Sequence, residues 1–221
     1  MTAIDTSRFA DLQEMTPRER RELMAVRVEL GRRDPMAYLR HRVRTMDQHD
    51  QEQPVKLFPW WRPYIAPLVQ TWRDNPLIVL CKARQMMLTW LFCALALWDA
   101  MYHPGRTIVL QSKTYDDALG KADSGQGLLG RCQFILAHDP ARQFGMVPPY
   151  TDRVQSIEFK HGSTIIPIAQ GAEKIQSLTC SGWFSDEAAR QPEFGGALGS
   201  ALATLRGGGW GVCLSTADMT D

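Results

Sequence analysis

The sequence predicts a three-layer α/β fold with a largely parallel central sheet, preceded by an α-helical extension. From residue 77 onward, apolar runs of strand length alternate with longer apolar runs of helix length. Parallel strands joined by helices produce this alternation. The chain has 221 residues, of which 44% are hydrophobic, so it can bury one sizeable core.

Bulk composition argues against several classes of protein. The net charge is +1, so any contact with nucleic acid must come from a local basic patch. The five cysteines form no CxxC pair, which favours buried thiols in a reducing cytosol. The chain opens with no signal peptide, and no apolar run nears the roughly 18 residues of a membrane helix. We therefore expect a soluble intracellular protein.

Residues 1–50 form the predicted extension. The letters TPRE from Thr16 are a capping-box pattern, which starts a helix that ends near position 33. The letters DP from Asp34 start a second helix, which we expect to end at Met46. The many arginines of this region indicate either a solvated helix face or an arm that faces DNA or a partner. There are nine of them, at positions 18, 20, 21, 27, 32, 33, 40, 42 and 44.

Residues 51–221 form the predicted second domain. A polar linker and the aromatic turn FPWWRPY lead into a short helix. Strands are predicted at LIVLC, TIVLQ, GWFSD and WGVCLS, with helices at TWLFCALALWDAMY and, as one long helix, at residues 115–136. The runs VQSIEFK and STIIPIA flank His161-Gly162 and predict a β-hairpin.

The stretch LIVLCKARQMMLTW has the layout of a phosphate-binding loop, because an apolar strand enters a polar turn that opens onto a helix. Laid over GxxxxGK[ST], Thr89 takes the hydroxyl position that binds Mg²⁺, and Leu88 falls where the lysine belongs. Lys82 stands at the first glycine and can reach the same phosphates, since the two ends of such a loop lie close together. Met87 replaces the second glycine and must avoid positive φ or tolerate strain of about 1–3 kcal/mol. A plain strand-to-helix junction is the alternative.

Two further pieces follow later strands. Asp186 and Glu187 end the strand in GWFSDEAA, where one carboxylate could hold Mg²⁺ and the next could activate water. Ser215-Thr216 ends the strand in VCLSTA and could place hydroxyls beside a γ-phosphate. Taken alone, each has a simpler interpretation, a surface dipeptide or a Ser/Thr turn. Together the three pieces lie at carboxyl ends of predicted strands, where ligands bind in open α/β sheets.

These residues resemble the large terminase subunits of tailed bacteriophages, the ATP-driven motors that package DNA into capsids. The resemblance covers roughly residues 55–217. KARQMMLT resembles the family's variant Walker A loop, and FKHGSTIIPIAQGAEKIQSLTCSGWFSDEAA is similar to the segment leading into Walker B. LSTA resembles the motif that couples hydrolysis to movement, TIVLQSKTYDDA the helicase-type segment, and FPWWRPY the adenine-contacting segment.

The resemblance implies a P-loop NTPase fold of the RecA/ASCE type, with residues 51–221 as the ATPase domain. It implies that Asp186 and Thr89 bind Mg²⁺, that Glu187 is the general base, and that Trp60 lies near the adenine. Ser215 and Thr216 would sense the γ-phosphate. The phosphate loop itself would bind ATP through Lys82, Ala83, Arg84, Gln85, Met86, Met87, Leu88 and Thr89.

It also implies the partners and place of such a motor. Double-stranded DNA, the portal protein and the small terminase subunit would be the partners, with no membrane involved. The chain would form a homo-oligomeric ring on the procapsid in the cytoplasm of the infected bacterial host, and could be a monomer in isolation. Family members continue into further ATPase strands and a nuclease domain, so we expect this chain to be an ATPase portion that does not cut DNA.

Three departures from the family pattern leave other interpretations open. Met87 stands where members usually keep glycine, no glutamine lies near Trp61, and the arginine finger could be Arg131, Arg142 or Arg153. One rival is another helicase-like ATPase that acts on nucleic acid. The other is a degenerate nucleotide fold that serves as an assembly or regulatory module without activity.

Overall fold

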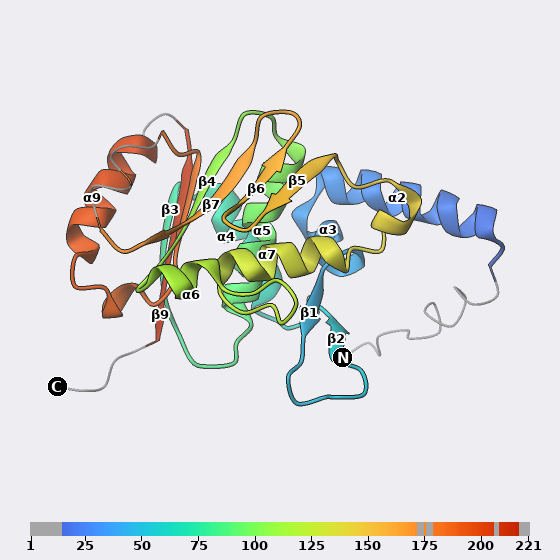
Figure 1. Ribbon diagram of the computed structural model, residues 1–221, viewed down its shortest axis with the longest axis horizontal. Coiled ribbons are helices and arrows are strands. Elements are labelled where there is room, and N and C mark those ends of the chain that lie inside the picture. The colour runs from blue at the N-terminus through green and yellow to red at the C-terminus, as the bar shows by residue number, and fades with distance from the viewer. Residues whose placement is uncertain (1–14, 172–174, 176–178, 206–207, 217–221) are drawn as a thin grey trace.

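The structure is a computed structural model that describes residues 15–171, 175, 179–205 and 208–216. Parts of the predicted extension, of the segment leading into Walker B and of the chain end therefore lie outside the described residues. A seven-stranded sheet forms the centre, in the order β3-β9-β8-β4-β7-β6-β5 (Figure 1). The first five of these strands are parallel and the last two are antiparallel, which confirms the predicted largely parallel sheet. The strands are β3 (Leu77–Lys82), β4 (Thr107–Ser112), β5 (Tyr150–Arg153), β6 (Ser156–Phe159), β7 (Thr164–Ala169), β8 (Gly182–Ser185) and β9 (Trp210–Thr216).

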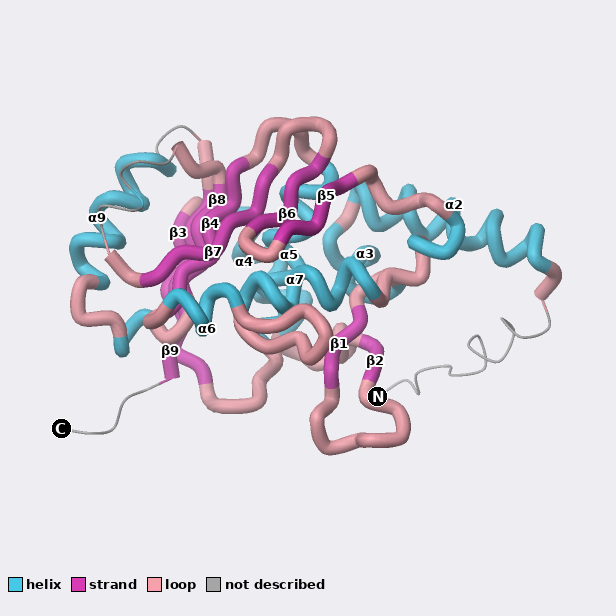
Figure 2. Tube along the Cα trace, viewed as in Figure 1, coloured by secondary structure: helices cyan, strands magenta, loops and turns pink. Residues whose placement is uncertain are grey.

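Helices cover both faces of the sheet, so the three-layer prediction is also confirmed (Figures 1 and 2). Alternate residues of one strand enter different cores, as the pleat requires. Phe184 of β8 belongs to the larger cluster, whereas its neighbour Trp183 belongs to a smaller one beneath α9. The covering helices are α4 (Ile65–Asp74), α5 (Leu88–Tyr102), α6 (Tyr115–Leu119), α7 (Leu128–Ala137) and α9 (Phe194–Leu205).

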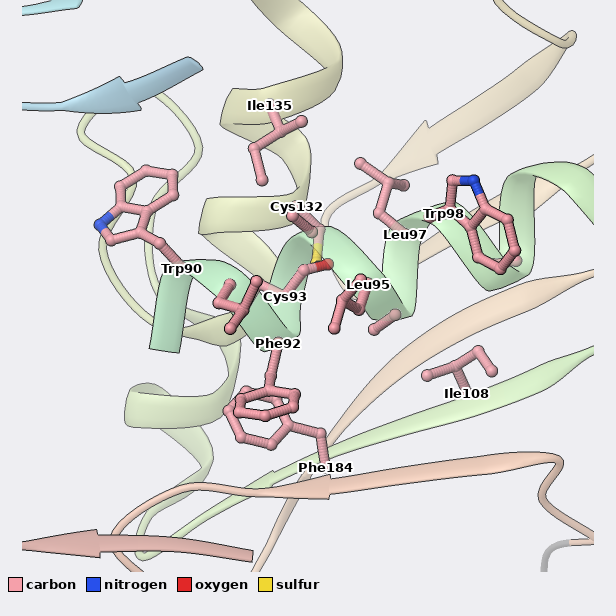
Figure 3. Packing of buried hydrophobic residues seen from close by; sticks show 14 of the residues in the cluster. Trp90, Phe92, Cys93, Leu95, Leu97, Trp98, Ile108, Cys132, Ile135 and Phe184 are labelled. Atoms are coloured by element: carbon pink, nitrogen blue, oxygen red, sulfur yellow. The ribbon is translucent and has the colours of Figure 1, made fainter. Parts of the chain in front are cut away.

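Helix α5 is the centre of the larger core, and Figure 3 shows its packing. Phe92 meets Phe184 of the sheet with ring centroids 5.8 Å apart. On the opposite side, the Cys132 thiol of α7 donates to the carbonyl of Cys93 at 3.5 Å. Because α5 is buried on nearly all sides, its position fixes the predicted phosphate loop that leads into it.

The amino-terminal helices begin as predicted, but the second ends early. Thr16 caps α2 (Pro17–Arg33) through a complete capping box, and Asp34 caps α3 (Pro35–His41). The expected helix to Met46 is wrong, because residues 44–46 form β1 (Arg44–Met46), which pairs antiparallel with β2 (Val55–Leu57). Tertiary packing overrides local helix propensity here.

The boundary at residue 50 stays a prediction, although α3 belongs to the main core. Tyr38 and Leu39 are fully buried in the cluster that contains α5. Helix α2 instead extends away from the sheet (Figure 1). Within the described ranges, no helix is both long enough and apolar enough to cross a bilayer.

The single long helix predicted for residues 115–136 is wrong. It is two helices, α6 and α7, separated by a loop in which Gly120 and Gly127 have φ of 69° and 68°. The backbones of the two glycines pack closely together, and a Cβ on Gly120 would meet the Gln126 carbonyl oxygen at 1.8 Å. The hairpin around His161-Gly162 is confirmed as β6 and β7, while β1, β2, β5 and α9 were not predicted.

Candidate functional site

The three predicted segments meet at the carboxyl edge of the parallel strands. Lys82 ends β3, Thr89 lies in the first turn of α5, and Asp186 follows β8. The Lys82 Nζ donates to Asp186 Oδ1 at 2.8 Å and to Thr89 Oγ1 at 2.9 Å. The Thr89 hydroxyl donates to Asp186 Oδ2 at 2.8 Å, which closes a triangle of one cation, one hydroxyl and one carboxylate. The side chains of Lys82 and Asp186 are only 9% and 10% exposed, so solvent screens their attraction weakly.

The predicted phosphate loop, residues 82–89, holds two residues other than glycine in the left-handed region. Gln85 has φ of 63° and Met87 has φ of 58°. Met87 therefore has a positive φ and tolerates the strain, which costs about 1–3 kcal/mol. Tyr64 supports the loop from outside, because its hydroxyl donates to the Met86 carbonyl at 3.0 Å. Met87 gives α5 no side-chain cap, which leaves the first N–H groups of the helix available to an anion.

The adjacent carboxylates of Asp186 and Glu187 have different hydrogen-bond partners. Glu187 adopts a left-handed backbone, with φ of 53° and ψ of 40°, and its N–H donates to Asp186 Oδ1 at 3.0 Å. Its Oε2 accepts from the Thr216 hydroxyl at 3.1 Å and lies 3.8 Å from the Arg190 Nε. Ser215 accepts from the Ala189 N–H at 3.2 Å. The end of β9 thus touches the segment that carries both carboxylates.

Sequence reasoning missed Gln191, which supports this segment from below. Its Nε2 donates to the Asp186 carbonyl at 2.9 Å and to the Ser185 hydroxyl at 3.0 Å. The side chain is only 4% exposed. No motif marks a glutamine at this position, because its importance depends on the turn after β8.

Three adjoining cavities surround this edge of the sheet. The phosphate loop lines one of about 420 Å³, together with Arg131, Glu187, Arg190 and Thr216. A second, of about 660 Å³, lies on the Asp186 side. The third, of about 880 Å³, lies between the loop and the β1–β2 hairpin. Arg131 lines all three.

Some of the predicted residues lie elsewhere. Trp60 is not among the described residues that line these cavities, and the Arg40 guanidinium sits 4.5 Å from its ring centroid. Its neighbour Trp61 is 49% exposed and lines the largest cavity. Of the three arginines considered for the finger, Arg142 and Arg153 are also absent from the described lining.

The donor set suits a hard divalent cation that also binds phosphate. In the described part of the chain, no group of three or more His, Cys, Asp or Glu side chains could hold a metal alone. Mg²⁺ commonly takes only one or two protein oxygens and completes its shell with water and substrate phosphates. The Thr89 hydroxyl and the Asp186 carboxylate supply such oxygens, and a cation, the Lys82 ammonium, already bridges them.

Comparison with known proteins identifies the fold. The HK97 bacteriophage large terminase matches 83% of this chain and 37% of its own, with a TM-score of 0.56 and 12% identity. The Thermus phage P74-26 large terminase ATPase domain matches at 0.47 and 19% identity, over 66% of this chain and 61% of that one. The large terminase of another thermophilic bacteriophage, in complex with ADP, matches at 0.47 and 18% identity, over 72% of this chain and 36% of that one.

The chain therefore has a mixed α/β fold similar to that of the HK97 bacteriophage large terminase. It spans 37% of the HK97 protein and 61% of the P74-26 domain. No protein-family model matches the sequence, and no curated protein matches it.

Proposed function

We propose that this chain is the ATPase part of a viral DNA-packaging motor, which hydrolyses ATP to translocate double-stranded DNA into a procapsid. The observation that carries the proposal is the triangle of Lys82, Thr89 and Asp186 beside Glu187, at the carboxyl edge of a terminase-like sheet. The carboxyl edge is where ligands bind in open α/β sheets. The cavity of about 420 Å³ beside it has room for a triphosphate.

In this proposal the chain binds ATP through the phosphate loop. Lys82 leaves Asp186 and neutralises phosphate oxygens, while the uncapped N–H groups of α5 donate to the same phosphates. Thr89 and Asp186 are then free to hold Mg²⁺, which supplies neutralisation of the charge on the β- and γ-phosphates. Exchange of Lys82 from Asp186 to phosphate would free the two oxygens that would hold Mg²⁺, so ATP binding and metal binding would be coupled.

Glu187 is the proposed general base. Its carboxylate lines the same cavity as the phosphate loop and can orient a water for in-line attack. Thr216 touches that carboxylate from the end of β9. Loss of the γ-phosphate would change this contact, and so shift the Ser215-Thr216 segment that we propose couples hydrolysis to movement.

The proposal also covers the position of the adenine and the partners of the chain. The adenine would lie near the aromatic segment, where Trp61 rather than Trp60 faces a cavity that adjoins the loop. DNA, the portal protein, the small terminase subunit, a ring of copies and the host cytoplasm follow from the terminase resemblance. The terminase likeness favours a packaging motor over another helicase-like ATPase.

A degenerate nucleotide fold remains the second candidate, because Met87 keeps the left-handed backbone without glycine. Measurement of ATP hydrolysis, with and without double-stranded DNA, decides between the two candidates. We expect hydrolysis that falls about 100-fold or more in Glu187→Ala, since that change removes general-base catalysis. Glu158→Ala, on the distant β6 strand, is the matched control and should keep the wild-type rate. Equal rates for wild type and Glu187→Ala would remove the catalytic role.

A further inference from the structure

We propose that Arg131 contacts the phosphates of ATP from within the same chain, as a phosphate-binding residue beyond the loop. The inference rests on the proposed function and deepens it. Arg131 lies on α7, a helix that carries none of the motifs, yet it lines the cavity of the phosphate loop together with Lys82 and Glu187. It lines the two adjoining cavities as well.

Two contacts hold the Arg131 guanidinium at this position. Its Cζ lies 5.4 Å from the ring centroid of Trp90, which follows Thr89 in the first turn of α5. Its Nη1 donates to the Gly127 carbonyl at 2.6 Å. Figure 3 shows the Trp90 ring at the start of α5, so a guanidinium over this ring lies beside the predicted phosphate loop. An arginine held over an aromatic ring loses little further freedom when it binds a ligand.

Charge distinguishes Arg131 from the other cations of this cavity. Lys82 is paired with Asp186, and Arg190 lies beside Glu187. Arg84 belongs to the loop itself and is exposed. Across the described ranges of the chain, Arg131 pairs with no carboxylate, and its buried Nε has no hydrogen-bond partner. A cation of this kind, facing a cavity, is suited to an anion.

The chemistry of the loop gives that cation a role. Leu88 occupies the position that usually carries the lysine, so the loop contributes Lys82 and the exposed Arg84 as its cations. Negative charge spreads over the oxygens of the transferred phosphoryl group in the transition state, and a guanidinium fork can bind two of them. Arg131 would supply this interaction without a neighbouring subunit.

The alternative is that Arg131 only packs against Trp90 and donates a hydrogen bond to the Gly127 carbonyl. Arg131→Met distinguishes phosphate binding from packing, because methionine keeps an unbranched apolar stem on Trp90 and removes the charge. Arg21→Met is the matched control, since Arg21 is an exposed residue of α2. We expect Arg131→Met to weaken binding of a non-hydrolysable ATP analogue tenfold or more and to weaken ADP binding less. The rate of hydrolysis should fall by about 10³. Arg21→Met should change neither nucleotide binding nor the rate of hydrolysis. The wild-type chain and both variants should have equal thermal midpoints of unfolding.

A mixing experiment tests whether the arginine acts within one chain. Lys82→Met has a disabled loop but an intact Arg131, whereas Arg131→Met has the reverse. Mixing the two variants should restore no activity, and recovery would show that Arg131 acts on a neighbour's site instead. Equal loss of ADP and ATP-analogue binding, or no loss, would overturn the phosphate contact. If the wild-type chain binds neither nucleotide, the proposed function fails as well; if it binds both, only the role of Arg131 is in question.

Discussion

Two buried ion pairs in this molecule have similar chemistry and different surroundings. Arg42 and Asp139 lie 2.6 Å apart with both side chains fully buried, and join the end of α3 to the segment after α7. Lys82 and Asp186 lie 2.8 Å apart at the edge of the sheet. The first pair is not among the described residues that line the three cavities, whereas Lys82 lines one of them and Asp186 lines its neighbour.

The partners of each pair explain the difference. Arg42 donates to both oxygens of Asp139 and to the Tyr102 hydroxyl, and Asp139 also accepts the Ala141 N–H at 2.9 Å. No further ligand is needed there. Among the residues that the structure describes, Lys82 donates only to the Thr89 hydroxyl and the Asp186 carboxylate, and a cavity adjoins them. A buried ion pair can take part in ligand exchange when a cavity adjoins it, and otherwise it fixes the fold.

The largest expected effect on stability is at the Arg42–Asp139 pair. Arg42→Met should lower the free energy of unfolding by about 3–5 kcal/mol, because it leaves the Asp139 charge buried and uncompensated. Urea denaturation measures the change. Arg32→Met breaks an exposed pair with Glu29 and should leave the unfolding midpoint unchanged. A small effect at Arg42 would contradict the structural role of this pair.

Loss of the lysine from the Lys82–Asp186 pair should strengthen metal binding at this position. Without nucleotide, the Lys82 ammonium occupies the space between Thr89 and Asp186, so Lys82→Met should bind Mn²⁺ more tightly than wild type. We expect a gain of about tenfold, equivalent to 1.4 kcal/mol. Electron paramagnetic resonance of free Mn²⁺ measures it, with exposed Lys160→Met as the control. Identical Mn²⁺ affinities in all three proteins would count against metal binding by these oxygens.

Backbone strain is a further property of the loop that follows Lys82. Gln85 is exposed in the phosphate loop and has φ of 63°, which glycine adopts freely. Gln85→Gly should therefore raise the free energy of unfolding by about 0.5–1 kcal/mol, whereas Gln85→Ala keeps the strain and should not. Chemical denaturation compares the two variants. Stabilisation by alanine as well as glycine would show that the backbone is not the cause.

Acid sensitivity is expected near the Arg42–Asp139 pair, because His41 immediately precedes Arg42. Burial, followed by the charges of Arg27, Arg40 and Arg44, lowers the pKa of His41 from 6.5 to about 4. The unfolded chain therefore binds more protons between pH 6.5 and 4, so stability falls as the pH drops through this window. His41→Gln should flatten that decline in unfolding curves taken at several pH values. Exposed His49→Gln should leave it unchanged, and an equal decline in both variants would remove His41 as the cause.

Sequence patterns predicted the parts of this molecule that depend on near neighbours. Strand ends, caps and the order of Lys82, Thr89 and Asp186 are local features, and parallel pairing brings such ends together at one edge. The helix over residues 115–136 failed because the contact between Gly120 and Gly127 forms only in three dimensions.

Residues that act through tertiary placement gave no signal. Gln191 reaches the site from a turn, and nothing in its local sequence marks it. Arg131 lines the cavities from α7, and its local sequence did not separate it from Arg142 and Arg153 as a candidate. Trp60 and Trp61 are adjacent, and only packing decides which of them faces a cavity. The motifs therefore predicted that Lys82, Thr89 and Asp186 lie together at this edge of the sheet, and local sequence could not predict the residues that the surrounding fold places beside them.

Calorimetric titration with a non-hydrolysable ATP analogue and Mg²⁺ tests the central claim most directly. We predict saturable binding to the wild-type chain and to Lys160→Met, and at least tenfold weaker binding to Lys82→Met and to Asp186→Asn. Charge-assisted contacts with phosphate and metal are lost in both variants. Binding that is absent from the wild type, or equally strong without the Lys82 ammonium, would contradict the account.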